Sequence, residues 1–244
     1  MGRLTAVFTR EFRGYFATPL AYVFLIIFIA LAQGLSFYVG GFYEQGQADL
    51  RSFFSFHPWL YLFLVPAVGM RLWAEENRSG TIELLLTLPI PLATIILGKF
   101  LAAWAFIGLA LALTTTIWLT ANYLGHPDNG VILASYLGSF FMAGGYLAIC
   151  SATSALTRSQ VIAFVISVTI CFLLTVTGVP VVLDITRALF PVALVETISS
   201  LSFFSHFLAI MNGVVDSRDF VFYASVIALF LYGTGVVIDL KKGA

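Results

Sequence analysis

The sequence predicts an all-α, polytopic membrane protein with six transmembrane helices, and two observations lead to this fold class. The first is composition: 60% of the 244 residues are hydrophobic, 10% are charged, and the mean hydropathy is +1.00. These values lie outside the range of soluble globular proteins. The second is a set of charge-free runs of about 20 residues or more, the length that a helix needs to cross a bilayer. These runs are 14–43, 52–70, 100–127, 131–157, 159–183 and 220–238.

The first element is a short amphipathic helix over residues 2–13. Apolar side chains recur on one side at helical spacing, and three arginines lie off that side. The apolar side carries Leu4, Val7, Phe8 and Phe12. We expect this segment to lie in the membrane interface; the alternative is a plain basic anchor before the first span. The apolar run that follows is far longer than the ~7–15 residues of a cleavable signal core, so it is predicted to be a retained span.

Orientation follows from the basic residues, because short loops rich in Lys and Arg stay cytoplasmic. With six spans and a cytoplasmic N-terminus, nine of the twelve basic residues are cytoplasmic. These are Arg3, Arg10, Arg13, Arg71, Arg78, Lys99, Arg158, Lys241 and Lys242. Both termini are therefore predicted to lie in the cytoplasm, with the chain in the plasma membrane, which is the inner membrane of a bacterial cell.

The region 184–218, before the last span, is predicted to lie outside the cell as short helices. Within it, the run 197–215 is apolar but carries several serines, a histidine and an asparagine, and Pro191 and Gly213 bracket it. A re-entrant or an interfacial helix fits this composition better than a seventh span. No linker or internal repeat divides the chain, so residues 1–244 form one predicted membrane domain.

Several functions find little support in the sequence. The spans almost lack ionisable residues, whereas ion-coupled carriers keep such groups at membrane depth. His57 is the exception, and an interfacial position at the outer face is favoured over a proton relay. Metal and catalytic motifs are absent. Gly98-Lys99 resembles the end of a phosphate loop, but Phe100 stands where Ser or Thr is required. No ATP site or other cofactor site is therefore predicted on this chain.

The polar residues concentrate in the segment 75–89, between the second and third spans. Gly80 is suited to cap the start of a short helix, and Glu83 then falls in its first turn, where a carboxylate favours the helix dipole. Pro89 ends the helix. The helix has hardly any polar side, because Ile82 and four leucines follow one another closely. So apolar a helix must be buried against lipid, its own bundle or a partner.

The chain resembles ABC-2-type transporter permeases. The resemblance lies in Ala74-Glu75-Glu76, Ser79 to Leu85, Leu88-Pro89 and Ile96 to Phe100. Further stretches resemble the gliding-motility-type branch of that family and extend the similarity over nearly the whole chain. They are Arg10-Glu11-Phe12, Pro19 to Tyr22, Pro66-Ala67, Met70 to Trp73, Ser154 to Gln160, Ser205-His206-Phe207 and Gly213 to Asp216. Asn77 departs from the branch, which often has a basic residue there.

The resemblance implies a half-transporter whose coupling helix, 75–89, contacts a cytosolic ABC ATPase. The residues that would form the joint are Glu75, Glu76, Gly80, Thr81, Glu83, Leu84 and Leu85. ATP and Mg are expected on the ATPase, so this chain is not expected to be an enzyme. It would pair with itself or with a second permease, which in the gliding-motility branch carries a large external domain. An exporter is the first expectation; the alternative is a membrane anchor that transmits force to an external protein.

Small residues in the fourth predicted span allow two interpretations. They permit close helix contacts either within the chain or across a dimer interface. The residues are Gly138, Gly144, Gly145, Ser151, Ser154 and Ala155.

Overall fold

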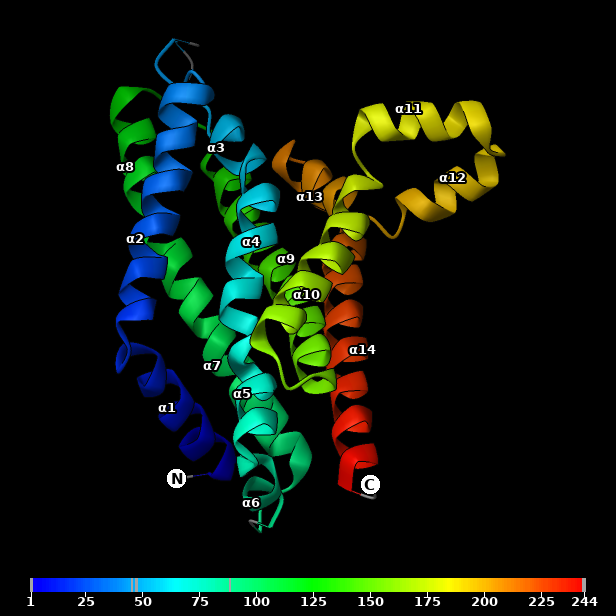
Figure 1. Cartoon of the computed structure of the whole chain (residues 1–244). Coiled ribbons are helices and arrows are strands. Elements are labelled where there is room, and N and C mark those ends of the chain that lie inside the picture. Colours follow the sequence, from blue (N-terminus) through cyan, green and yellow to red (C-terminus); the bar gives the residue numbers. More distant parts are fainter. Residues whose placement is uncertain (1, 45, 47, 88, 243–244) are drawn as a thin grey trace.

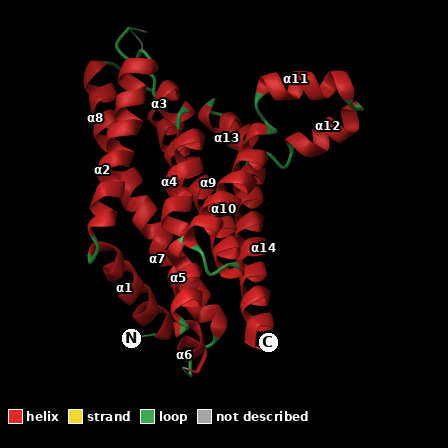
Figure 2. Cartoon of the chain, viewed as in Figure 1, coloured by secondary structure: helices red, strands yellow, loops and turns green. Residues whose placement is uncertain are grey.

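The computed structural model describes residues 2–44, 46, 48–87 and 89–242, and every regular element in these ranges is a helix (Figure 2). The all-α prediction is confirmed. The helices are α1 (Arg3–Phe16), α2 (Pro19–Gly34), the π-helical turn η1 (Leu35–Val39), α3 (Arg51–Ser55), α4 (His57–Gly69), α5 (Arg71–Ser79), α6 (Thr81–Thr87), α7 (Leu92–Leu113), α8 (Thr115–Leu124), α9 (Asn129–Leu156), α10 (Gln160–Val176), α11 (Pro180–Leu189), α12 (Val192–Ser199), α13 (Phe203–Met211) and α14 (Ser217–Lys242).

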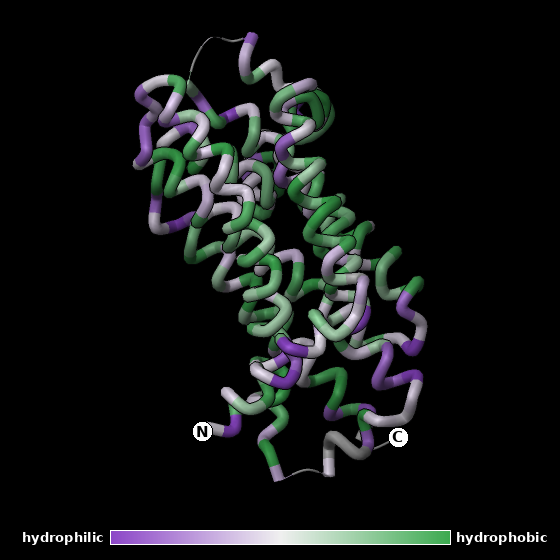
Figure 3. Tube along the Cα trace, turned by 90° about the vertical axis from the view of Figure 1, so that its left-hand side faces the viewer, coloured by the Kyte–Doolittle hydropathy of each residue, from purple (hydrophilic) through white to green (hydrophobic). Residues whose placement is uncertain are grey.

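Four stretches of the described chain are long and apolar enough to cross a membrane: Ala21–Val39, Leu92–Leu124, α9 and Ser217–Lys241. The pair α10 and α11 adds a fifth if it counts as one span, although the two helices meet at 74°. The predicted number of six is thus not confirmed by length alone, because α4 has only 13 residues. Hydrophobic residues dominate the middle of the bundle, and most hydrophilic residues lie toward its ends (Figure 3).

Both chain ends lie at the same end of the bundle, together with α6 (Figure 1). We call this the termini end. The helix α1 lies there against α7, and α2 begins after a short turn. The apolar side of α1 packs on α7. Val7 is buried, and a Cβ on Gly98 would lie only 2.6 Å from Cγ1 of Val7. Because α1 continues to Phe16 and α2 begins only at Pro19, the first span begins later than the predicted residue 14. The interfacial position of α1 stays a prediction.

The central element is α9, which contacts α4, α5, α7, α10, α13 and α14. Its glycines make these contacts close. A Cβ on Gly144 would lie 2.8 Å from Trp104 of α7, and one on Gly145 would lie 2.5 Å from Phe203 of α13. Gly69 of α4 meets Cys150 of α9 in the same way, at 2.4 Å. The small residues of the fourth predicted span thus serve packing within this chain, the first of the two interpretations.

The fifth predicted span, 159–183, ends early because α10 stops at Val176. Pro180 starts α11 in a new direction, and its ring cannot continue the preceding helix. Gly178 lies at the break, where a Cβ would come within 2.2 Å of the Ser202 hydroxyl. The end of α10 is therefore held against the start of α13. Beyond the break, α11 and α12 project away from the bundle (Figure 1).

The sequence suggested a single helix over 197–215, but the structure does not form one. The run is divided between the end of α12 and the nine residues of α13. Ser202 caps α13 by accepting a hydrogen bond from the Ser205 N–H, and Gly213 has a φ of +85° just past its end. Phe203 and Phe207 of α13 are buried in the core with α9. Within this run, no helix of the described chain is long enough to count as a candidate span.

Candidate functional site

The segment 75–89 is two helices joined at Gly80, rather than the single short helix that the sequence predicted. Glu75 and Glu76 belong to α5, and α6 begins at Thr81. Gly80 has a φ of +73° and closes the end of α5. Gly80 also immediately precedes Thr81, so α6 begins where the sequence predicted. What the sequence missed is that Gly80 ends α5 as well, in the left-handed C-cap conformation that glycine adopts without steric cost. The Ser79 and Thr81 hydroxyls lie 2.8 Å apart across this joint.

The helix α6 lies at the tip of the termini end (Figure 1). Glu83 falls in its first turn, as predicted, and both Glu83 and Thr81 are exposed. The backbones of Leu84 and Leu85 belong to α6, but their side chains lie outside the described residues. The polar members of the predicted joint thus lie on two consecutive helices, α5 and α6, and we call this pair the coupling hairpin.

The two glutamates of α5 have different surroundings. Glu75 is exposed and pairs with Arg71, one turn earlier, at 3.3 Å. Glu76 is half-buried, and its Oε1 lies 2.6 Å from the Nζ of Lys99. Lys99 comes from α7 and is only 4% exposed, and its Nζ also lies 3.3 Å from Oε2 of Glu11 in α1. One buried lysine therefore joins three helices at the termini end.

Burial and the neighbouring positive charges shift the pKa values of these two carboxylates in opposite directions. Burial raises the pKa of Glu76, and the attraction of Lys99 offsets this only in part. Burial also raises the pKa of Glu11, but Lys99 and Arg10 outweigh it, so the net pKa of Glu11 is lowered. Oε2 of Glu76 is buried and has no hydrogen-bond partner within the described structure. The positive charges near Glu11 thus outweigh the cost of burying its carboxylate, whereas those near Glu76 do not.

Sequence reasoning missed the role of Lys99, which it counted only as one cytoplasmic positive charge. The available signal was its position within the first turns of an apolar helix that begins at Leu92. A lysine there must find a partner or extend to water. Because the partners come from residues 11 and 76, the sequence could not identify them. The ring of Trp73 adds a cation–π contact, with its centroid 5.4 Å from Nζ.

A hydroxyl from α9 holds the break between α4 and α5. Ser154 Oγ accepts hydrogen bonds from the N–H groups of Trp73 and Ala74, at 3.0 and 2.9 Å, and donates one to the Met70 carbonyl at 2.8 Å. A side chain inserted into the backbone ladder is a recognised cause of helix breaks. Ser151 accepts a further bond from the indole N–H of Trp73 at 3.0 Å. The start of α5 is thus fixed to α9.

Asn77 fixes the other end of α5 to the same helix. Its amide donates to the carbonyls of Ala155 and Thr157, at 3.2 and 3.1 Å, at the C-terminus of α9. Lys241 of α14 donates to the Ala155 carbonyl as well, at 2.6 Å. A basic residue at position 77 would stand beside Lys241 on the same carbonyl. This repulsion gives a physical reason for the neutral amide at the position where the resemblance leads one to expect a base.

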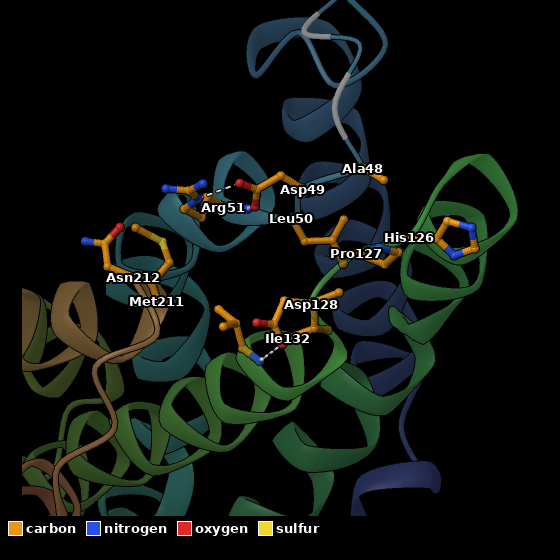
Figure 4. Close-up of a pocket in the computed structure, with 11 residues that line it drawn as sticks. Ala48, Asp49, Leu50, Arg51, His126, Pro127, Asp128, Ile132, Met211 and Asn212 are labelled. Atoms are coloured by element: carbon orange, nitrogen blue, oxygen red, sulfur yellow. Dashed lines mark hydrogen bonds and ion pairs between the residues drawn. The ribbon is translucent and has the colours of Figure 1, made fainter.

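The opposite end of the bundle holds a second polar region, a cavity of about 360 Å³. Asp49, Arg51, Asp128 and Asn212 lie around it (Figure 4). Their polar groups are largely engaged with neighbours in the chain. Arg51 pairs with Asp49, and Asp128 accepts hydrogen bonds from the first N–H groups of α9. These contacts fix the loops before α3 and α9.

His57 is buried inside the bundle, and its interfacial depth stays a prediction. Its Nδ1 lies 2.8 Å from the Ser139 hydroxyl of α9, and Phe53 packs edge-on against its ring. Tyr61 reaches the same hydroxyl at 2.8 Å. The histidine is thus part of the contact between α4 and α9. No group of three or more His, Cys, Asp or Glu side chains in the described ranges could hold a metal ion.

Fold and composition define the class of this chain: it is a multi-pass α-helical membrane protein. The family model of the ABC-2 family transporter protein matches residues 60–238, and the chain belongs to that family. It is accordingly a permease component of an ABC transporter, and membership of the family implies association with an ATPase subunit. The comparison with curated proteins gave no match.

Proposed function

We propose that this chain is the permease subunit of an ATP-driven exporter and that 75–89 receives the motion of a separate cytosolic ATPase. The observation that carries the proposal is the placement of α5 and α6. The exposed Thr81 and Glu83 stand on the coupling hairpin, at the end of the bundle where both termini lie (Figure 1). ATP and Mg would bind to the ATPase. This chain would hold no cofactor and catalyse no reaction.

The contacts of α5 support a mechanical route from α6 into the bundle. Ser154 and Asn77 tie α5 to α9, and Lys99 ties it to α7 and α1. When the ATPase subunits close on ATP, α6 would move with them and displace α5 and α7 as one body. Such coupling needs no titratable group at membrane depth. The scarcity of ionisable residues in the middle of the spans fits this mechanism.

The proposed topology has six spans, with α3 and α4 together forming the second, over 52–70, and α10 with the first residues of α11 forming the fifth, over 159–183. The termini end would be cytoplasmic, since nine of the twelve basic residues belong to it or to its loops under this topology. The membrane would be the plasma membrane, and the whole of 1–244 would form one domain. The rest of α11, together with α12 and α13, makes up most of the region 184–218 and would then lie on the outer side.

The proposed assembly contains a second permease, either another copy or a related subunit with a large external domain. The second choice follows the resemblance to the gliding-motility branch. The glycines of α9 are occupied by contacts within the chain, so the pairing surface would lie on other helices. The alternative function, force transmission to an external protein without a substrate, uses the same coupling hairpin. The projecting α11 and α12 give that alternative a surface to act on (Figure 1).

The test is purification of the tagged chain in mild detergent, with identification of all co-purifying proteins and an assay of ATP hydrolysis. An ABC ATPase should be recovered in an active complex, with or without a second permease. Stimulation of hydrolysis by an added amphiphilic compound would favour the exporter over the force-transmitting anchor. A chain that purifies without any ATPase, from cells in which the complex is intact, would overturn the proposal.

A further inference from the structure

A cavity and a groove adjoin at the termini end, and together they have the form of a site for an amphiphile. The cavity, of about 240 Å³, lies among Glu11, Glu75, Glu76, Lys99 and Arg71. The groove, of about 170 Å³, is lined mainly by apolar residues of α2, α4 and α7. Tyr15, Thr18 and Arg71 line both. A charged compartment is thus continuous with an apolar one.

The groove faces the side of the bundle formed by α2. Val23 and Ile27 line it and are 48% and 41% exposed, so the groove opens outward between apolar side chains. Phe24 and Phe106 form its inner wall and are buried. In a chain that spans a membrane, hydrocarbon surrounds such a face. A lipid acyl chain is the occupant that matches a groove of this polarity.

The charged residues that line the cavity indicate which kind of lipid headgroup it would accept. Two cations, Arg71 and Lys99, face three carboxylates, so the lining carries an excess of one negative charge. Glu75 contacts the Nε of Arg71 at 3.3 Å, and the other N–H groups of the guanidinium have the fork geometry that suits a phosphate. Oε2 of Glu76 is buried without a partner and can accept a hydrogen bond from an ammonium group. A net anionic headgroup would worsen the charge excess, whereas a zwitterionic one would balance it.

We infer that a phosphatidylethanolamine molecule binds here, with an acyl chain in the groove, its phosphate at Arg71 and its ammonium group at the carboxylates beside Lys99. Its position in the cytoplasmic leaflet rests on the topology in the proposed function. The lipid would link the turn between α1 and α2 to the start of α5. It would therefore contact the helices through which the coupling hairpin is proposed to act.

The test is native mass spectrometry of the purified full-length chain, with any partner that co-purifies, titrated with phosphatidylethanolamine and with phosphatidylglycerol. Phosphatidylethanolamine adducts should form at several-fold lower lipid concentration. Arg71→Ala should weaken this binding about tenfold, the effect of one lost charge-assisted hydrogen bond. Glu76→Gln should reduce the preference for phosphatidylethanolamine, because it removes the partner of the ammonium group. Arg51→Ala, an arginine at the opposite end of the bundle, is the matched control and should bind as the wild type does.

The groove is tested separately by Ala67→Phe, which fills it from α4. Ala30→Phe adds the same ring to the exposed face of α2, away from the groove, and serves as the control. Loss of lipid in the first variant alone is expected. Equal binding of both lipids by the wild type, or unchanged binding in Arg71→Ala and Ala67→Phe, would overturn the inference. So would disulfide pairing of Ala67→Cys with a second copy in membranes, because another subunit would then cover the groove. The lipid readout does not require ATPase binding, so the two proposals can fail independently.

Discussion

Lys99 Nζ lies 2.6 Å from Glu76 Oε1, and this contact joins α7 to α5, the first helix of the coupling hairpin. The lysine is buried, and Glu11 of α1 shares it. Three segments that are distant in sequence therefore meet at one cation. Any displacement of α5 at the termini end must carry α7 and α1 with it or break this pair.

The two carboxylates around Lys99 should respond differently to neutralisation. The pKa of Glu11 is lowered from 4.5, so its ionisation contributes stability above about pH 4.5 that is lost as the pH falls through the lowered value. The pKa of Glu76 is raised from 4.5, so its contribution is fully present below that value and is lost as the pH rises. At pH 7, Glu11→Gln should therefore lower the melting temperature more than Glu76→Gln.

Thermal unfolding in detergent between pH 4 and pH 8 measures this difference, which should shrink as the pH approaches the lower limit. Equal melting temperatures of the two variants at pH 7 would contradict the assignment. Glu44→Gln changes an exposed carboxylate at the opposite end and is the control for a general charge effect.

Ser154→Ala should destabilise the chain by about 1–3 kcal/mol, because it leaves the buried N–H groups of Trp73 and Ala74 without an acceptor. Ser225→Ala removes an exposed hydroxyl that bonds only within its own helix and should change stability by less than about 0.5 kcal/mol. Chemical unfolding in detergent compares the two. Similar losses would show that Ser154 does not hold the break between α4 and α5.

Asn77→Lys should lower stability by about 2 kcal/mol, since it removes two hydrogen bonds to α9 and places a charge beside Lys241. The double variant Asn77→Lys with Lys241→Met should recover part of the loss, because the repulsion is then gone. A double-mutant cycle of melting temperatures gives the coupling. Strict additivity of the two substitutions would argue against the explanation given for the asparagine.

The topology can be tested with single cysteines, because Cys150 and Cys171 are both buried and should not react. His126→Cys, before α9, should label from the outside of intact cells. Arg158→Cys, after α9, should label only when the membrane is opened. Both positions are exposed. The reverse pattern would invert the orientation, and labelling of both from one side would remove α9 from the set of spans.

Residue patterns along the chain were sufficient to predict an all-helical fold with several apolar spans, but not the breaks between its helices or their partners. The apolar runs predicted the fold class, and Gly80 with Glu83 located the start of α6. The division of 75–89 was missed because Gly80 suits both a cap at the start of a helix and one at its end. Lys99 and Ser154 act on residues 23 and 80 or more positions away in the chain, and such contacts leave no local signal.

The most direct test of the central claim is photo-crosslinking in intact membranes from a probe at Glu83, compared with a probe at Glu44 at the opposite end of the bundle. The account predicts a crosslink to an ABC ATPase from position 83 and none from position 44. Absence of an ATPase crosslink at position 83, in a complex that hydrolyses ATP, would contradict the assignment of 75–89 as the coupling segment.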